Sequence, residues 1–293
     1  MTCAVCGAAA LRPYLAVNRS EQESLRPSSE SYGTAAADIV RCVVCGHAQV
    51  QEMPALEDLD EGYAQAADDS YAREEAGQRV TAARAVERIE RHVARGALLD
   101  LGCWLGFLPS EASKRGWETL GIEPSQYASE FAREQLGLDV RTETIEGADL
   151  PGHAYDAVVM ADVIEHLPRP GESLERVREL LKPGGVLYLQ LPDAGSAVAR
   201  RMGARWWSVL PTHVQYFTRE SLARLLERHG FTSEWIGTAP KTFSTRYYIE
   251  RLAGYAPPAA RVGVKVAEAA GLAGRLVTPN FRDRMEVVAR LRP

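Results

Sequence analysis

Two pairs of cysteines near the N-terminus have the spacing of metal ligands. Cys3 and Cys6 form one Cys-x-x-Cys pair, Cys42 and Cys45 form a second, and a glycine follows each pair directly. Two such pairs facing each other supply four thiolates, the ligand set of a tetrahedral structural zinc site. We therefore predict a small zinc-binding module over residues 1–55. A redox dithiol and free cysteines are the alternatives.

The zinc module is small and contains a long spacer. The 35 residues between the two pairs exceed the commonest spacing of a zinc ribbon, so an inserted loop is expected. Thiolate ligation would contribute the folding free energy that so small a core cannot supply. His47, close behind the second pair, could replace one cysteine as a ligand.

A second group of residues has the spacing of a nucleotide site. Asp100, Gly102 and Gly106 follow a short apolar run, at a point where a strand would end and a helix begin. Glycines at such a turn let backbone N–H groups approach a ligand, and the helix N-terminus favours negative charge. Glu123 ends the next apolar run, 23 residues beyond Asp100, where a carboxylate can accept both hydrogen bonds of a ribose diol. The Gly-x-Gly-x-x-Gly spacing of a nicotinamide site is absent.

Four segments in order resemble the motifs of the class I S-adenosylmethionine-dependent methyltransferases; they are residues 98–106, 120–125, 155–167 and 180–187. The first motif of that family is a strand ending in Asp-x-Gly-x-Gly-x-Gly, and Trp104 stands here at the middle glycine. The resemblance implies a Rossmann-like α/β sheet and S-adenosylmethionine as the cofactor.

The resemblance also implies which residues bind the cofactor. Gly102 and its surroundings would hold the methionine portion, Glu123 the ribose, and the segment 143–146 would lie along the adenine. Asp162, at the end of the fourth strand, would lie beside the cofactor. The implied cofactor-binding residues are Asp100, Gly102, Trp104, Gly106, Glu123, Thr144, Ile145 and Asp162.

Glu165 and His166 follow the fourth expected strand, at the edge where open α/β sheets bind ligands. The pair could cap and anchor the next helix, or it could face the substrate together with Asp162. In the related ubiquinone O-methyltransferases a similar acidic and histidine cluster holds a divalent metal near a catechol. That cluster is only partly matched here, so metal-assisted catalysis stays an alternative.

The segment 205–218, Arg-Trp-Trp-Ser-Val-Leu-Pro-Thr-His-Val-Gln-Tyr-Phe-Thr, should lie above the same sheet edge. His213 is the candidate general base, because imidazole accepts a proton near neutral pH. Tyr216 and His166 complete the catalytic candidates. The aromatic residues of this segment could be walls of an acceptor site or a hydrophobic cover over the sheet; they are Trp206, Trp207, Tyr216 and Phe217. Thr218 should cap the next helix with only half a capping box, because Ser221 replaces the usual Glu.

The elements that must position these residues follow from hydrophobic patterning. Short apolar runs alternate with helical stretches from residue 97 onward, which favours βαβ units and a mostly parallel sheet. Strands are expected at 97–101, 118–122, 138–142, 155–161, 185–191, 231–237 and 284–291. Helices are expected at 106–115, 125–136, 172–181 and 218–229.

The remaining segments complete the expected domain organisation. Residues 56–95 should form a helical linker whose apolar stripe is Val80, Ala83, Val86, Ile89 and Val93. The methyltransferase domain should span 96–293, with an inserted substrate-binding or dimer-forming region at about 239–283 before the last strand. A helix from Ala259 to about Ala270, with Arg261 and Lys265, could make that insert a membrane-surface or dimer-forming element.

Charge is distributed unevenly along the chain. The net charge is −5 for residues 1–95, −9 for 96–199 and +9 for 200–293. The basic C-terminal third suggests an acceptor that carries phosphate or carboxylate, or simply a solvated basic surface. No apolar run approaches the length that spans a bilayer, and no secretory signal begins the sequence, so a cytoplasmic protein is expected.

The sequence therefore predicts O-methylation of a hydroxyl on a sugar or secondary metabolite, with Arg246 and Arg251 of the insert orienting the acceptor. Carbon methylation of a nucleotide-linked sugar is one alternative. Methylation of rRNA is another, although the acidic N-terminal third makes nucleic acid an unfavoured partner. A non-catalytic scaffold that binds the cofactor is the alternative from another class.

Overall fold

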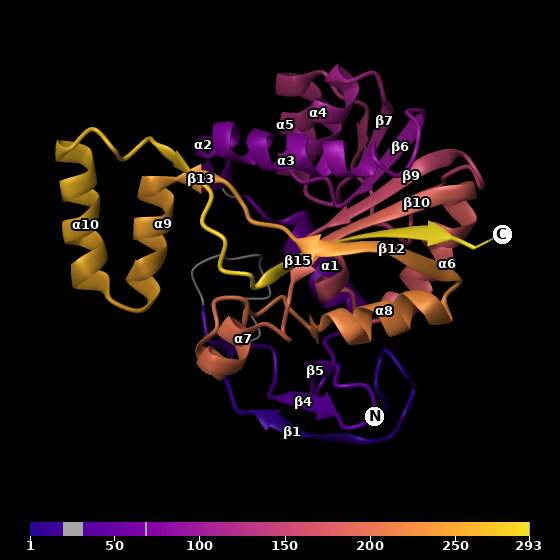
Figure 1. Cartoon of the computed structure of the whole chain (residues 1–293), viewed down its shortest axis with the longest axis horizontal. Coiled ribbons are helices and arrows are strands. Elements are labelled where there is room, and N and C mark those ends of the chain that lie inside the picture. Colours follow the sequence, from indigo (N-terminus) through magenta and orange to yellow (C-terminus); the bar gives the residue numbers. More distant parts are fainter. Residues whose placement is uncertain (20–31, 68, 293) are drawn as a thin grey trace.

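The computed structural model describes residues 1–19, 32–67 and 69–292. Its centre is a seven-stranded sheet in the order β12-β15-β10-β9-β6-β7-β8 (Figure 1). β15 is antiparallel to both of its neighbours, and the other strands run parallel to one another. The strands are β6 (Ala97–Leu101), β7 (Glu118–Ile122), β8 (Val140–Arg141), β9 (Tyr155–Ala161), β10 (Leu181–Pro192), β12 (Phe231–Thr238) and β15 (Arg284–Leu291).

Helices cover both faces of this sheet, as the alternation of side chains along its buried strands requires. In β9, Ala157 and Val159 pack with the helices α3 and α4, while Val158 and Met160 pack with α6 and α8. The helices are α3 (Glu75–Ile89), α4 (Phe107–Lys114), α5 (Gln126–Leu136), α6 (Pro170–Leu180) and α8 (Arg219–Arg228). The expected Rossmann-like α/β fold is confirmed.

A second, four-stranded sheet in the order β1-β4-β5-β11 lies below the main sheet in Figure 1. Its strands are β1 (Leu11–Leu15), β4 (Ile39–Cys42), β5 (Ala48–Val50) and β11 (Gln215–Tyr216). Between β1 and β4 in the sequence, β2 (Asn18–Arg19) and β3 (Thr34–Ala35) form a separate short parallel pair. β11 comes from the segment after β10 and pairs antiparallel with β5. The N-terminal sheet is therefore completed by a strand from the C-terminal third of the chain.

The chain also forms short helices outside these layers; they are α1 (Leu56–Ala64), α2 (Asp69–Arg73), η2 (Ile164–His166), α7 (Ala197–Met202) and η3 (Gly203–Arg205). No helix among the described residues is long and apolar enough to cross a membrane.

Residues 239–283 leave the sheet after β12 and return to it at β15. β13 (Phe243–Ser244) pairs with β14 (Leu276–Val277) at the base of this insert. Beyond the base, α9 (Thr245–Arg251), η4 (Leu252–Gly254) and α10 (Pro257–Ala269) form a helical hairpin that projects from the body of the molecule (Figure 1).

Three local expectations need correction. β8 is shorter than expected and β10 is longer, beginning at Leu181. The apolar contact face of α3 is made by residues buried at three- and four-residue spacing, Ala82, Ala85, Val86 and Ile89, whereas Val80 and Ala83 are only partly buried. The capping box of α8 is complete, because the Ser221 hydroxyl accepts the Thr218 N–H at 2.9 Å in place of a glutamate.

Candidate active site

A pocket of about 770 Å³ opens at the carboxyl ends of the central strands. Gly102 lies just after β6, Glu123 after β7 and Asp162 after β9, and all three line the pocket. This edge is where the connections of an open parallel sheet leave room for a ligand.

The turn after β6 contains three residues with positive φ, a backbone conformation that favours glycine. Gly102, Trp104 and Gly106 have φ of 74°, 47° and 78°, so alternate residues adopt the left-handed region. A side chain in this region costs about 1 kcal/mol, and Trp104 is one of four non-glycine residues with positive φ among those described. At Gly102 an added Cβ would lie 2.7 Å from Val163 Cγ2. The turn therefore keeps its shape although tryptophan replaces the middle glycine.

Two buried acids lie beneath this turn. The Glu123 carboxylate accepts the N–H of Trp104 at 2.7 Å and of Ser125 at 2.9 Å. Burial raises its pKa to about 7 despite these two donors. Burial and the charge of Glu123 raise the pKa of Asp100 to about 8, and Asp100 Oδ1 has no partner among the described residues. Both carboxyl groups can accept hydrogen bonds from a ligand with hydroxyl or ammonium groups.

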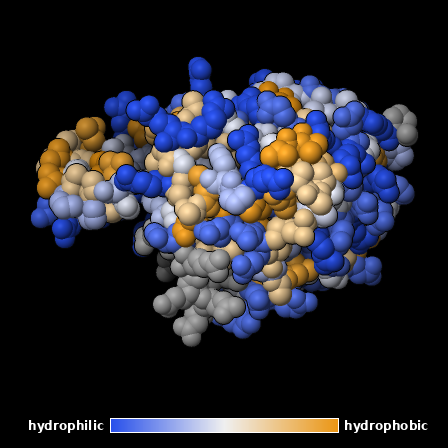
Figure 2. Space-filling model, turned by 90° about the horizontal axis from the view of Figure 1, so that it is seen from below, coloured by the Kyte–Doolittle hydropathy of each residue, from blue (hydrophilic) through white to orange (hydrophobic). Residues whose placement is uncertain are grey.

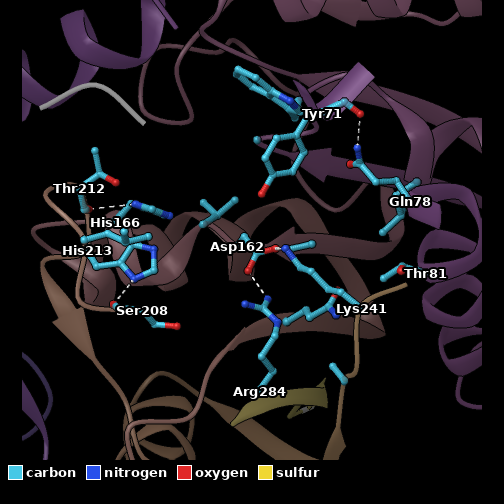
Figure 3. A pocket seen from close by; sticks show the side chains of 18 of the residues that line it. Tyr71, Gln78, Thr81, Asp162, His166, Ser208, Thr212, His213, Lys241 and Arg284 are labelled. Atoms are coloured by element: carbon cyan, nitrogen blue, oxygen red, sulfur yellow. Dashed lines mark hydrogen bonds and ion pairs between the residues drawn. The ribbon is translucent and has the colours of Figure 1, made fainter. Parts of the chain in front are cut away.

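Asp162 is neutralised by two cations. Lys241 Nζ lies 2.5 Å from Asp162 Oδ2, and Arg284 forms an ion pair with Oδ1. Burial alone would raise the pKa of Asp162, but the charges of Arg284 and Lys241 outweigh it and lower the pKa below its usual range. Figure 3 shows the carboxylate between these two cations, with the two histidines of the pocket at its other side. Sequence reasoning missed both cations, which lie 79 and 122 residues from their partner.

His166 and His213 lie side by side in the pocket, with ring centroids 4.6 Å apart at an interplanar angle of 82°. His166 Nδ1 donates to the Thr212 carbonyl and His213 Nδ1 to the Ser208 carbonyl, both at 2.9 Å (Figure 3). Because a carbonyl only accepts, the Nδ1 atoms carry the protons, and each Nε2 keeps a lone pair. Burial lowers the pKa of His166 to about 4, and burial together with the charge of His166 lowers the pKa of His213 well below its usual value. Both imidazoles are therefore neutral near pH 7.

Glu165 completes a cluster that could act as base or as metal ligands. It is 1% exposed, and neither carboxylate oxygen has a partner among the described residues. Burial, and then the charge of Asp162, raise its pKa to about 8. One ligand atom from each of Glu165, His166 and His213 lies within 4.8 Å of the others. Two imidazoles and a carboxylate are a known ligand set for divalent metals. Asp162 pairs with cations instead, so the cluster differs from the one expected.

Residues 71–234 match the family model described as a methyltransferase domain. The chain belongs to this methyltransferase family. The ubiquinone biosynthesis O-methyltransferase of Nitrobacter winogradskyi is 31% identical over 168 residues, 51% of this chain and 62% of the relative. That of Cereibacter sphaeroides is 32% identical over 145 residues, 45% of this chain and 59% of the relative. The matched regions thus span about three fifths of these curated relatives.

Solved methyltransferase structures have the same fold. The 1,6-didemethyltoxoflavin N1-methyltransferase of Burkholderia thailandensis, solved with S-adenosylhomocysteine, aligns at a TM-score of 0.52 and 16% identity, over 86% of this chain and 98% of that one. An S-adenosylmethionine-dependent methyltransferase of Thermotoga maritima aligns at 0.51 and 18% identity, over 77% and 95%. These two structures show the fold, and the family model together with the curated relatives confirms the expected family of S-adenosylmethionine-dependent methyltransferases.

The methyltransferase brings most of the expected cofactor-binding residues to one pocket. Those that line it are Asp100, Gly102, Trp104, Glu123, Thr144, Ile145 and Asp162. Gly106 instead begins α4 as its N-cap, where an added Cβ would lie 2.8 Å from Leu138 Cδ1. The Trp104 indole N–H is buried without a partner among the described residues. These unpartnered polar atoms and the acids beneath the turn fit S-adenosylmethionine, which carries an ammonium group and a ribose diol.

Tyr216 does not lie with the histidines. It belongs to β11, is 5% exposed, and packs with Ile39 and Val50 in the core of the N-terminal sheet. The expectation that it contacts the acceptor is corrected, because period-two alternation in a strand aims it away from the pocket. Of the four aromatic residues of that segment only Trp207 lines the pocket. Arg246 is also remote; it is half-exposed and pairs with Glu250 and Glu268.

Elements outside the Rossmann-like sheet supply the remaining walls. α1 contributes Tyr63 and α2 contributes Tyr71, and the insert contributes Phe243, Tyr247 and Arg251. Phe243 stacks on Tyr247 at 4.0 Å, and the Arg251 guanidinium lies over the Tyr247 ring at 4.5 Å. Arg251, which was expected to orient the acceptor, does line the pocket. The aromatic residues had no motif to mark them, since aromatic side chains are equally common in a hydrophobic core.

The four N-terminal cysteines converge as expected for a metal site. The Sγ atoms of Cys3 and Cys45 are 3.5 Å apart, those of Cys6 and Cys42 are 3.6 Å apart, and all four lie within 4.8 Å of one another. A tetrahedral zinc with bonds of about 2.3 Å has edges of about 3.8 Å, so the thiols fit it, whereas a disulfide is about 2 Å long. Both following glycines have left-handed φ, which closes each knuckle turn.

The N-terminal module that carries the four cysteines is tied to the segment that carries His213. His47 Nε2 lies 2.8 Å from Gln215 Oε1, and the Gln215 amide donates to the carbonyls of Leu167 and Pro168 at 3.2 Å. His47 is fully buried and also packs on Phe217 at 4.7 Å between ring centroids. It therefore ties the N-terminal module to the segment that follows His213, and it lies outside the four-cysteine cluster.

Proposed function

We propose that this methyltransferase transfers the methyl group of S-adenosylmethionine to a hydroxyl of a small-molecule acceptor, with His213 as general base. The observation that carries the proposal is the pair of neutral imidazoles in the pocket, each with Nδ1–H held by a carbonyl and Nε2 free to accept a proton. The names of the curated relatives support transfer to oxygen.

The cofactor, when bound, supplies an electrophilic methyl group, so the protein has mainly to align the acceptor and exclude water. The Ser208 carbonyl fixes the His213 ring, whose Nε2 then accepts the hydroxyl proton. His166, in edge contact with that ring, holds it in place and offers a second acceptor for the proton. Tyr71, Tyr247 and Phe243 form aromatic walls for a flat acceptor.

Charge in the pocket favours an acceptor that carries an anionic group. The charged residues that the structure describes in the wall near Gly102 and Glu123 are all acidic, which suits a cationic cofactor; they are Asp60, Asp100, Glu123 and Glu146. The wall formed with the insert and β15 contains more cations than anions; its charged residues are Lys241, Arg251, Arg282, Arg284, Asp162 and Asp283. A carboxylate or phosphate on the acceptor would complement this second wall.

The test begins with transfer of a labelled methyl group to pools of hydroxylated small molecules, divided into anionic and neutral pools. With an acceptor in hand, His213→Gln is expected to lower kcat about 100-fold or more, with little change in S-adenosylhomocysteine affinity. Full turnover by His213→Gln would refute the base. Turnover restored by a divalent metal after chelation would instead assign the histidine cluster to metal binding.

The same assay separates the competing functions. A product labelled on carbon would favour the sugar C-methyltransferase, and label in rRNA would favour the nucleic-acid substrate. Cofactor binding without transfer to any pool would favour the scaffold. We also propose that the four cysteines bind structural zinc, on the basis of the sulfur geometry.

A further inference from the structure

Exposed apolar side chains concentrate on the insert. Ten large hydrophobic side chains are exposed in the described part of the chain, and six of them lie between residues 252 and 281. The six are Leu252, Val262, Val266, Leu272, Leu276 and Phe281. Scattered exposed side chains need no explanation, but a cluster on one projecting element indicates an interaction surface.

α10 has two different faces. Ala260 and Ala267 are buried on the side that packs against α9. Val262 and Val266, one turn apart, are each 62% exposed on the outer side. Figure 2 shows apolar side chains gathered at the projecting end of the molecule, with hydrophilic ones beside them.

The cations beside this apolar face have no carboxylate partner in the part of the chain that the structure describes. Arg261 and Lys265 are exposed and lie one turn apart on α10, next to the valines. The two carboxylates of the hairpin, Glu250 and Glu268, are both engaged by Arg246, at 2.7 and 2.9 Å. No ion pair forms between Arg261 or Lys265 and any carboxylate of the described residues. The outer face is therefore apolar along its centre and positive along its edge.

We propose that the α9–α10 hairpin docks on an anionic lipid bilayer surface. A helix with an apolar face and adjacent cations lies in the membrane interface, where apolar burial and attraction to anionic headgroups add together. Symmetric pairing of two copies through this face would bring the arginine and lysine side chains of both copies together. Repulsion between these cations would oppose such a dimer, so a second copy is the less favoured partner for this face.

The docked face adjoins the mouth of the methyltransferase pocket. Leu252 and Phe281 line the pocket and are also 52% and 49% exposed. Their exposed side chains extend the apolar surface of the hairpin to the pocket rim. An amphiphilic acceptor held in the bilayer could enter there without crossing water.

The test is flotation of the full-length protein with phosphatidylcholine vesicles, with and without phosphatidylglycerol. Binding is expected only with the anionic lipid and should fall as salt rises. R261Q/K265Q is expected to lower the partition coefficient about 30-fold, and V262S/V266S roughly tenfold. The matched control is R12Q/R224Q, which removes two exposed arginines elsewhere and should bind like the wild type.

All variants should keep the wild-type affinity for S-adenosylhomocysteine, because none of the substituted residues lines the pocket. Equal flotation with neutral and anionic vesicles, or an equal loss in R12Q/R224Q, would overturn the proposal. A dimer in light scattering that V262S/V266S abolishes, with no vesicle binding, would assign the face to a second copy instead. Because cofactor affinity is measured separately, failure of membrane binding leaves the methyltransferase proposal intact.

Discussion

Acidification should weaken cofactor binding through Glu123. This carboxyl group is 3% exposed, and burial raises its pKa to about 7 in the protein without ligand. A ribose diol donates hydrogen bonds to the ionised form, whereas a protonated carboxyl group loses acceptor capacity. Binding is therefore linked to release of a proton whenever the pH lies below that pKa.

The size of the effect follows from the pKa. Below about pH 7 the dissociation constant of S-adenosylhomocysteine should rise about tenfold for each unit of pH, reaching roughly 100-fold near pH 5. Because the pKa of Asp100 is about 8, the dissociation constant should already begin to rise, more weakly, as the pH falls below about 8. Without ligand, the raised pKa of Glu123 stabilises the fold below about pH 4.5. That contribution, at most about 3 kcal/mol, is lost as the pH rises through about 7.

Calorimetry of S-adenosylhomocysteine binding, in buffers with different ionisation enthalpies, measures both affinity and proton release. Glu123→Gln should bind weakly at every pH and lose most of the slope below pH 7. Glu118→Gln, an exposed position on the same strand, is the matched control and should keep the wild-type profile. A wild-type dissociation constant that stays constant between about pH 5 and 7, or an unchanged slope in Glu123→Gln, would refute the reasoning.

Three further predictions concern the turn and the zinc module. Purified protein should contain about one zinc per chain by mass spectrometry, and its removal should lower the midpoint of thermal unfolding; an unchanged midpoint would contradict a structural role. Gly102→Ala should lower the free energy of unfolding by at least about 1 kcal/mol and abolish S-adenosylhomocysteine binding. Adding Val163→Ala should restore only the stability lost to the clash with Val163, because the left-handed backbone of residue 102 stays strained. Gln215→Ala should destabilise the fold by about 2–3 kcal/mol and also lower kcat, because it releases the His213 segment; normal kcat with lowered stability would restrict Gln215 to folding.

The cofactor half of the site could be predicted from sequence because its residues follow strands directly. Gly102, Glu123 and Asp162 each end a short apolar run, and parallel strands bring such ends to one edge. Trp104 was the one anomaly in the motif, and its left-handed backbone shows that the turn tolerates the substitution at a cost.

Much of the part of the pocket proposed to bind the acceptor could not be predicted, because its residues come from distant segments and follow no periodic sequence pattern. Lys241 lies at the start of the insert and Arg284 begins β15, and the pairing of β12 with β15 brings both to Asp162. Tyr216 was misplaced for a related reason. A two-residue strand has too little pattern to be recognised, and a single step along a strand reverses the side on which a side chain points.

The strand β11 has a consequence for the order in which the protein forms during synthesis. Gln215 follows its partner His47 by 168 residues, which a ribosome adding about 5–20 residues per second needs roughly 10–30 s to make. All four cysteines have emerged long before, so the zinc that we propose for them would hold the N-terminal segment to the β4–β5 hairpin while the outer edge of β5 is still unpaired. The last strand to join that sheet directly follows the segment that carries His213, so completing the N-terminal sheet also brings His213 beside His166.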